Sequence, residues 1–386
     1  MLPQLELRKF VTPEFIFGDG ARLFAGRYAK NLAAKKILIV TDPGIIKTGL
    51  VDELSYTLTE KDLEYEIFSN VTPNPRDYEV MEGAEVFSSE ECNFIIALGG
   101  GSPMDCAKGI GIVSSNKKHI LDFKGVDKVP VPSPPLICIP TTAGSSADVS
   151  QFAIILDTEE NLKVAIVSKA VVPDIALIDP FTTLTMDRHL TSVTGFDALI
   201  HSIESYVSNA SSQITDLHAL DSIKIINQNI SPVLNDLKNL EFRSNMMMGS
   251  LEAGLAFSNA SLGLVHAIAH SLGGIVDLSH GECNVAVLEY VVDFNFYSSP
   301  ERYIEIGEAL GIKFNGLDIN AKKEALLNKL KELKLLCEMD FNLGEMGLEE
   351  KHIVPLAKNI INDPCVVTNP RKPSVENIAE ILKNAL

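Results

Sequence analysis

Short apolar runs alternate with longer amphipathic segments through the first half of the chain. The runs are often β-branched, and the segments between them have the apolar spacing of helices. The runs lie at 36–41, 65–68, 94–98, 135–140, 152–156, 163–168 and 174–179. The first four have the rhythm of a parallel sheet with crossover helices, and the later ones continue the strand-like pattern.

The apolar spacing changes after Pro180. From about residue 183, apolar residues recur every three or four positions, which predicts helices. Two series with this spacing are Leu217, Ile223, Ile226, Ile230, Leu234 and Leu237, and Leu326, Leu330, Leu333 and Leu336. We therefore expect an α/β domain over 1–182 and an all-helical domain over 183–386.

Composition and charge narrow the class of protein. The 386 residues are 46% hydrophobic and 22% charged, which is ordinary for a folded globular chain of two domains. A formal charge of −18 repels phosphate backbones and anionic lipid surfaces, so no nucleic-acid or membrane partner is expected.

The N-terminus shows no export signal, and no apolar run is long enough to span a membrane. The six cysteines are far apart and form no CxxC pair, which favours reduced, buried thiols and a cytoplasmic protein. They are Cys92, Cys106, Cys138, Cys283, Cys337 and Cys365.

A glycine-rich loop follows the apolar run at 94–98. Gly99, Gly100, Gly101 and Ser102 lead directly into a helical pattern, where backbone amides can approach a pyrophosphate. The pattern is neither GxGxxG nor a P-loop, and a plain tight turn is the alternative interpretation.

A second polar loop, PTTAGSSADVS at 140–150, follows the next predicted strand and offers Thr141 and Thr142. Both loops would lie at the carboxyl ends of parallel strands, where open α/β sheets bind ligands. Asp42, after the first run, can accept hydrogen bonds from a ribose, or can cap the helix that begins at Pro43.

The segment GLVHAIAHSLGG places His266 and His270 four residues apart, on one face of a helix. TGFDALIHSIESY repeats this spacing with Asp197 and His201, and His280 follows in LSHGECN. One carboxylate with several imidazoles suits zinc or ferrous iron. The alternatives are a stack of core histidines and an Asp–His ion pair on a helix surface.

In order along the chain, GGGSPMDCAK, IPTTAGSS, TGFDALIHSIESY, GLVHAIAHSLGG and HGECN resemble motifs of the iron-containing (group III) alcohol dehydrogenases. The resemblance extends nearly over the whole chain, to TNPR at 368–371. It implies a Rossmann-like domain and an all-helical domain, the dehydroquinate synthase-like fold, with the site in the cleft between them. A homodimer is the family expectation.

The resemblance also implies roles for individual residues. The metal ligands would be Asp197, His201, His266 and His280, with Fe2+ expected and Zn2+ possible, while His270 would be a non-ligand proton carrier. The cofactor contacts would be Asp42, Asn74, Gly99, Gly100, Gly101, Ser102, Thr141, Thr142, Lys163 and Leu184. An acid at the Asp42 position implies NAD rather than NADP.

One motif departs from the family's usual wording. Many members have GTGSEVT where this chain has GSSADVS, so Ser146 replaces a glycine, Ala147 a serine and Asp148 a glutamate. We expect these replacements to affect the backbone of this loop and its contacts near the nicotinamide.

The implied reaction is the NAD-dependent, metal-dependent interconversion of a primary alcohol and its aldehyde by hydride transfer. A glycerol- or diol-type dehydrogenase of the same fold is the alternative, and Phe152, Met247 and Phe257 hint at an apolar pocket. Dehydroquinate synthase is disfavoured because few bases occur between residues 183 and 300. A non-catalytic relative is disfavoured because all five metal-site and histidine positions are retained.

Overall fold

The first half of the chain forms a parallel sheet of six strands in a computed structural model that describes residues 9–275 and 280–386. The strands are β1 (Glu14–Phe17), β2 (Lys36–Val40), β3 (Glu64–Phe68), β4 (Phe94–Gly99), β6 (Leu136–Pro140) and β9 (Ile175–Ile178). Their order is β1-β9-β6-β4-β2-β3, so the chain reverses its direction across the sheet between β2 and β4. Ligands bind at such switch points in open α/β sheets.

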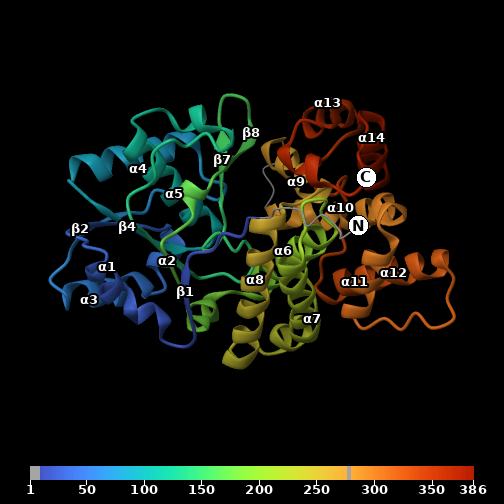
Figure 1. The fold of residues 1–386 in the computed structure, drawn as a ribbon, viewed down its shortest axis with the longest axis horizontal. Coiled ribbons are helices and arrows are strands. Elements are labelled where there is room, and N and C mark those ends of the chain that lie inside the picture. Colours follow the sequence, from blue (N-terminus) through green and yellow to red (C-terminus); the bar gives the residue numbers. More distant parts are fainter. Residues whose placement is uncertain (1–8, 276–279) are drawn as a thin grey trace, which may run out of the picture.

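Helices cover both faces of this sheet, as the left half of Figure 1 shows. They are α1 (Ala25–Asn31), α2 (Pro43–Ile46), α3 (Leu50–Thr59), α4 (Asp77–Ser89) and α5 (Gly101–Asn116). In β2, Leu38 and Val40 join one hydrophobic cluster, and Ile37 and Ile39 join another. Because successive side chains point to opposite faces, a strand buried on both sides is a continuous apolar run.

Two of the predicted strands leave the main sheet. β7 (Phe152–Asp157) and β8 (Leu162–Val167) form an antiparallel hairpin, and the short β5 (Gly125–Val126) pairs with β8. The connection between β7 and β8 is too short for a parallel crossover, which needs a dozen or more residues. Periodicity predicted these strands but did not predict their separate sheet; β1 and β5 were not predicted.

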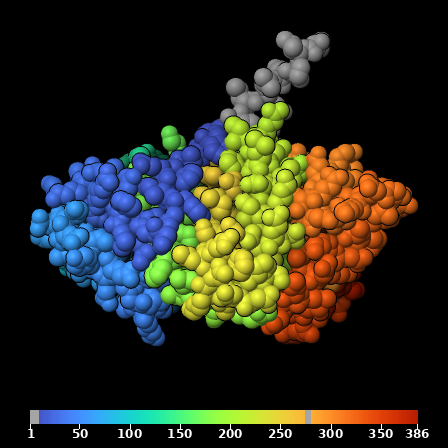
Figure 2. Space-filling model, turned by 90° about the horizontal axis from the view of Figure 1, so that it is seen from below, coloured from blue at the N-terminus to red at the C-terminus, as the bar shows by residue number. Residues whose placement is uncertain are grey.

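The second half is helical and occupies the right side of Figure 1. Its α-helices in the described residues are α6 (Arg188–Val207), α7 (Gln213–Asn235), α8 (Leu240–Ala260), α9 (Leu264–Ile275), α10 (His280–Asn295), α11 (Pro300–Ala309), α12 (Ile319–Leu336), α13 (Glu350–Ile360) and α14 (Val375–Asn384). Seen from below in Figure 2, α7 and α8 form the surface between the sheet region and the C-terminal helices.

The apolar series in α7 and α12 are largely buried, with two exceptions. Leu217 is 73% exposed and Leu336 is 37% exposed, so these two side chains lie on the exposed sides of their helices. Leu217 lies six residues before Ile223, which on a helix is a rotation of about 240° away from the buried stripe.

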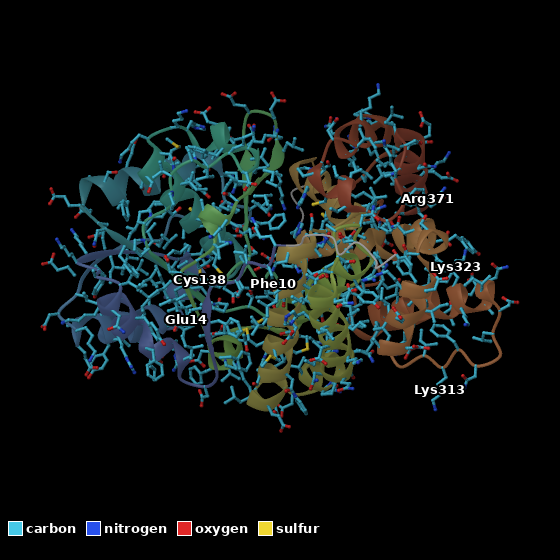
Figure 3. All side chains as sticks on the ribbon, viewed as in Figure 1. Phe10, Glu14, Cys138, Lys313, Lys323 and Arg371 are labelled. Atoms are coloured by element: carbon cyan, nitrogen blue, oxygen red, sulfur yellow. The ribbon has the colours of Figure 1, made fainter. Side chains whose placement is uncertain are left out.

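The two halves share one hydrophobic core. Ala176 and Ile178 of β9 belong to the same buried cluster as the helices α6 to α10. The N-terminal segment also crosses to the helices, because Val11 exchanges hydrogen bonds with Asn259 of α8, at 2.6 and 3.1 Å. In Figure 3, Phe10 lies at this crossing and Cys138 lies within the sheet.

The predicted division at 182/183 falls in a short 3-10 helix, η4 (Pro180–Thr185), between β9 and α6. Among the described residues, no helix has the length and apolarity that crossing a membrane requires.

Candidate active site

Three helices of the second half contribute the predicted metal residues. Asp197 and His201 lie on α6, His266 on α9, and His280 at the start of α10. The side chain of Asp187 begins α6 by accepting a hydrogen bond from the Leu190 amide at 2.7 Å. Asp197 and His201 therefore project from successive turns of one helix, as their spacing predicted.

The structure brings these four side chains together. Oδ1 of Asp197 lies 3.9 Å from Nε2 of His201 and 3.7 Å from Nε2 of His266. The rings of His201 and His266 stack with centroids 4.6 Å apart, and the ring of His280 lies 5.3 Å from that of His266. Asp197, His201 and His266 form a group whose ligand-capable atoms all lie within 4.8 Å of one another, and His280 is not part of this group.

Burial and the interactions within the cluster shift the pKa values of its members in different directions. Burial alone would raise the pKa of Asp197, but the surrounding histidines hold it well below its usual range. Burial lowers the pKa of His201 to about 4, and burial together with Lys163 lowers that of His280. For His266 the effect of burial is outweighed by Asp197 and Glu204, which raise its pKa to about 9.

The residues fit a divalent cation. Nitrogen and carboxylate ligands of zinc bind at about 2.0 to 2.2 Å, so atoms that share an ion lie several ångströms apart without hydrogen bonding each other. Oδ1 of Asp197 lies 3.7 and 3.9 Å from its two neighbouring imidazole nitrogens. These distances exceed hydrogen-bond length and match those between atoms that bind the same ion. Among the described residues, the buried Nδ1 of His280 has no hydrogen-bond partner, unlike an ordinary core histidine.

The alternative interpretations explain the cluster less well. Asp197 and His201 are 6% and 4% exposed, so they are not an ion pair on a helix surface. A stack of core histidines leaves Nδ1 of His201 and Nδ1 of His280 buried without a hydrogen-bond partner among the described residues, which is unusual for histidines that only fill a core.

His270 lies beside this cluster. Its ring stacks on that of His280 at 5.4 Å and meets the ring of His266 edge-on at 6.3 Å. Nδ1 of His270 lies 2.9 Å from Oδ2 of Asp363, in the segment between α13 and α14. Cys365 completes a second group of ligand-capable atoms, but burial raises the pKa of its thiol well above the usual range. At neutral pH this thiol is therefore protonated.

The predicted cofactor loops meet at the carboxyl ends of neighbouring strands. Gly99 ends β4 beside Pro140 of β6, and the Thr141 amide donates to the Gly99 carbonyl at 2.9 Å. A Cβ on Gly100 would lie 3.2 Å from the side chain of Thr142, so the loops pack closely. The Asn74 amide donates to Oγ of Ser102 at 3.2 Å.

The remaining cofactor candidates lie around these loops. Asp42 caps α2, because its Oδ1 accepts from the amides of Gly44 and Ile45 at 2.7 and 3.1 Å, as the alternative interpretation held. The side chain of Lys163 extends from β8 to Gly273 of α9, where a Cβ would lie 2.8 Å from its Nζ. Leu184 lies in η4, and its carbonyl accepts from Nζ of Lys238 at 2.6 Å.

The departure from the usual loop motif has a conformational consequence. Ser146 has φ +48, the left-handed region that a glycine adopts without strain. Its Oγ donates to the Ser250 carbonyl at 2.6 Å, which anchors the loop to α8. The chain therefore retains the backbone geometry of a glycine at this position.

Two of the three apolar residues predicted to line a pocket lie near the cluster. The ring of Phe257 stacks on that of His201 at 4.3 Å, and Phe152 lies 5.8 Å from Phe257. Met247 is buried in the core of the helical half.

Sequence reasoning missed three polar residues of the site. Nδ2 of Asn284 donates to Oδ1 of Asp197 at 2.8 Å and lies 3.1 Å from Nε2 of His266. Its position four residues after His280 was an available signal, as was that of Glu204 three residues after His201. No local signal marked Asp363, which lies 93 residues from its partner His270.

A parallel sheet with ligand loops at its switch point, joined to a buried carboxylate–imidazole cluster, is typical of a metal-dependent dehydrogenase. Family models agree with this class. The model of the iron-containing alcohol dehydrogenases matches residues 12–180, and that of the C-terminal region of the same family matches residues 191–386. The chain belongs to the iron-containing alcohol dehydrogenase family, and it is an alcohol dehydrogenase.

Relatives and solved structures agree over the full length. The NAD-dependent methanol dehydrogenase of Bacillus methanolicus is 37% identical, with 98% of this chain and 99% of that protein aligned. The crystal structure of a 1,3-propanediol oxidoreductase superposes with a TM-score of 0.95 at 34% identity, covering 99% of this chain and 100% of that one. A sulfoacetaldehyde reductase from Bifidobacterium kashiwanohense, solved with NAD+, has a TM-score of 0.86 at 26% identity, with 99% of each chain covered.

Proposed function

We propose that this alcohol dehydrogenase interconverts a primary alcohol and its aldehyde, with NAD as hydride carrier and Fe2+ held by Asp197, His201, His266 and His280. The observation that carries the proposal is the buried cluster itself, in which two imidazole nitrogens approach one carboxylate oxygen at 3.7 and 3.9 Å. Zn2+ is the second metal that this donor set accepts.

A divalent metal, when bound, supplies Lewis-acid stabilisation of negative charge on the substrate oxygen. The chain's own residues supply the proton path. Asp363 accepts from Nδ1 of His270, so Nε2 of the neutral ring is left to accept the hydroxyl proton of the alcohol. The surrounding core excludes water, since His266 and His270 are 1% and 4% exposed.

The assignment of NAD is supported by the residues at the switch point. We assign Asp42, Asn74, Gly99 to Ser102, Thr141, Thr142, Lys163 and Leu184 to the cofactor site. The cap of α2 uses Oδ1 of Asp42, which leaves Oδ2 as an acceptor for ribose hydroxyls and as a negative charge that repels a 2′-phosphate. The relative solved with NAD+ adds support.

A diol-type substrate is the second candidate. The similarity to a 1,3-propanediol oxidoreductase favours it. The ring of Phe257, which stacks on His201 and packs against Phe152, favours a short aliphatic alcohol instead.

We further propose a homodimer of two-domain subunits divided near residue 182. Within the part of the chain that the structure describes, β1 is an edge strand that pairs on one side, and Phe15 on it is 39% exposed, which suits pairing with a second copy. A mass of two chains by light scattering is expected. The free, buried cysteines support a cytoplasmic location.

The test is NADH production by protein purified without oxygen and reconstituted with Fe2+ or Zn2+, over short primary alcohols, diols and glycerol. We expect iron-dependent oxidation of primary alcohols, and loss of both bound metal and activity in His266→Ala. Stoichiometric metal without turnover of any alcohol would contradict the proposed substrate class. Retention of metal by His266→Ala would contradict the ligand set.

A further inference from the structure

Besides the two proposed ligands, helix α6 carries one more buried carboxylate side chain. Glu204 lies seven residues after Asp197 and is 4% exposed. Its Oε2 lies 2.6 Å from Nδ1 of His266, and its Oε1 accepts from the Val265 amide at 2.7 Å. The same helix therefore supplies two proposed ligands and a contact to the third.

Three donors of α9 meet the two oxygens of Glu204: the Val265 amide at Oε1, and the backbone amide and Nδ1 of His266 at Oε2. A backbone amide only donates, so Oε1 must accept from Val265. An ionised carboxylate also only accepts, so Nδ1 of His266 must carry a proton. A glutamine would turn its NH2 group toward one of these donors, and that hydrogen bond would be lost.

The contact fixes the ring of His266 in one tautomer. A histidine binds a metal as the neutral ring, so with the proton on Nδ1 the lone pair of His266 lies on Nε2, which is the nitrogen 3.7 Å from Oδ1 of Asp197. Metal-bound histidines are commonly oriented in this way by a carboxylate on the other ring nitrogen.

Glu204 also positions the start of α9. The Val265 amide is in the first turn of α9, where amides have no partner within the helix. Gly263 immediately precedes the first residue of α9, and a Cβ at this position would lie 2.8 Å from Oε1 of Glu204. A glycine at 263 thus allows the carboxylate to approach the helix end, so the ring and the backbone of α9 are held by one side chain.

We propose that Glu204 is a positioning residue of the metal centre, which presents Nε2 of His266 to the ion by binding Nδ1 and the first turn of α9. The inference rests on the proposed ligand set of Asp197, His201, His266 and His280. The role is distinct from ligation, because both oxygens of Glu204 are used by donors of α9.

The test compares Zn2+ affinity, by competition with a chromophoric chelator, in wild type, Glu204→Gln and Ser205→Ala. Ser205 is buried on the same helix and bonds only to the Ser202 carbonyl among the described residues, so it controls for damage to α6. We expect Glu204→Gln to weaken Zn2+ binding roughly 10- to 100-fold and Ser205→Ala to leave it unchanged. The absorption bands of bound Co2+ should change in Glu204→Gln alone.

Wild-type affinity and an unchanged Co2+ spectrum in Glu204→Gln would overturn the positioning role. Failure of the wild type to bind one Zn2+ would instead overturn the proposed metal site. Because Glu204→Gln can impair folding, a second measurement uses the zinc-loaded wild type. Its 15N spectrum should show His266, assigned by its absence in His266→Ala, protonated at Nδ1, and protonation at Nε2 instead would refute the inference.

Discussion

Nδ1 of His270 donates to Oδ2 of Asp363 at 2.9 Å, joining helix α9 to the segment before α14. The other carboxylate oxygen, Oδ1, accepts from the Cys365 amide at 2.8 Å. Burial would raise the pKa of Asp363, but the interaction with His270 holds it below the usual value. The carboxylate is therefore ionised and fixed in place at neutral pH, and it holds the ring of His270 against the histidine cluster.

Asp363→Asn should lower kcat without loss of metal. The amide keeps an oxygen for the Cys365 backbone but turns NH2 toward His270, which disfavours the tautomer with a proton on Nδ1. We expect a loss of roughly 10- to 1,000-fold in kcat, because a misoriented base loses part of the general acid–base contribution. Metal content by elemental analysis is the control, and an unchanged kcat would rule out the orienting role.

His270→Ala should lower turnover more than Asp363→Asn does. Removing the proton carrier forfeits the whole contribution of general acid–base catalysis, about 10²- to 10⁴-fold. Steady-state kinetics and metal content should be measured on the same preparation. Full metal occupancy is expected, and loss of the ion in this variant would make His270 a ligand.

Gly99→Ala should weaken NADH binding by roughly tenfold or more, measured by fluorescence titration. A Cβ at Gly99 would lie 2.6 Å from Cγ of Pro103, so the loop between β4 and α5 must shift. Gly307→Ala is the matched control, since its Cβ would lie 2.4 Å from Cζ of Phe314, far from the loop in sequence. Both variants should lose stability; an equal loss of NADH affinity in both would indicate a general folding defect.

The native thiols should be unreactive toward a thiol reagent at pH 8, and six should react after unfolding in guanidinium. Burial raises the pKa of Cys92 to about 11 and those of Cys283 and Cys337 to about 12, so little thiolate forms. Since unfolded thiols ionise near pH 9, folding stability should fall as pH rises above that value. Rapid labelling of the native protein would contradict the burial.

Much of the architecture could be predicted from local pattern. The apolar runs at 36–41 and 94–98 became β2 and β4, because a strand buried on both faces has no polar alternation. The spacing of Asp197 and His201 predicted one helical face, since residues four apart lie on successive turns. Pairing of β7 with β8 outside the main sheet was not predictable from periodicity, which carries no information about partners.

The sequence by itself determined the alternation of strands and helices and the glycine loop after β4, because these follow from spacing and side-chain chemistry. Spacing also grouped one carboxylate with several histidines, and the family resemblance implied which four of these residues are the candidate ligands. Only the tertiary structure decided which distant groups meet them. Asp363 reaches His270 across 93 positions and Glu204 reaches His266 across 62. Such contacts depend on how the helices pack, and packing is set by the whole core rather than by any local segment.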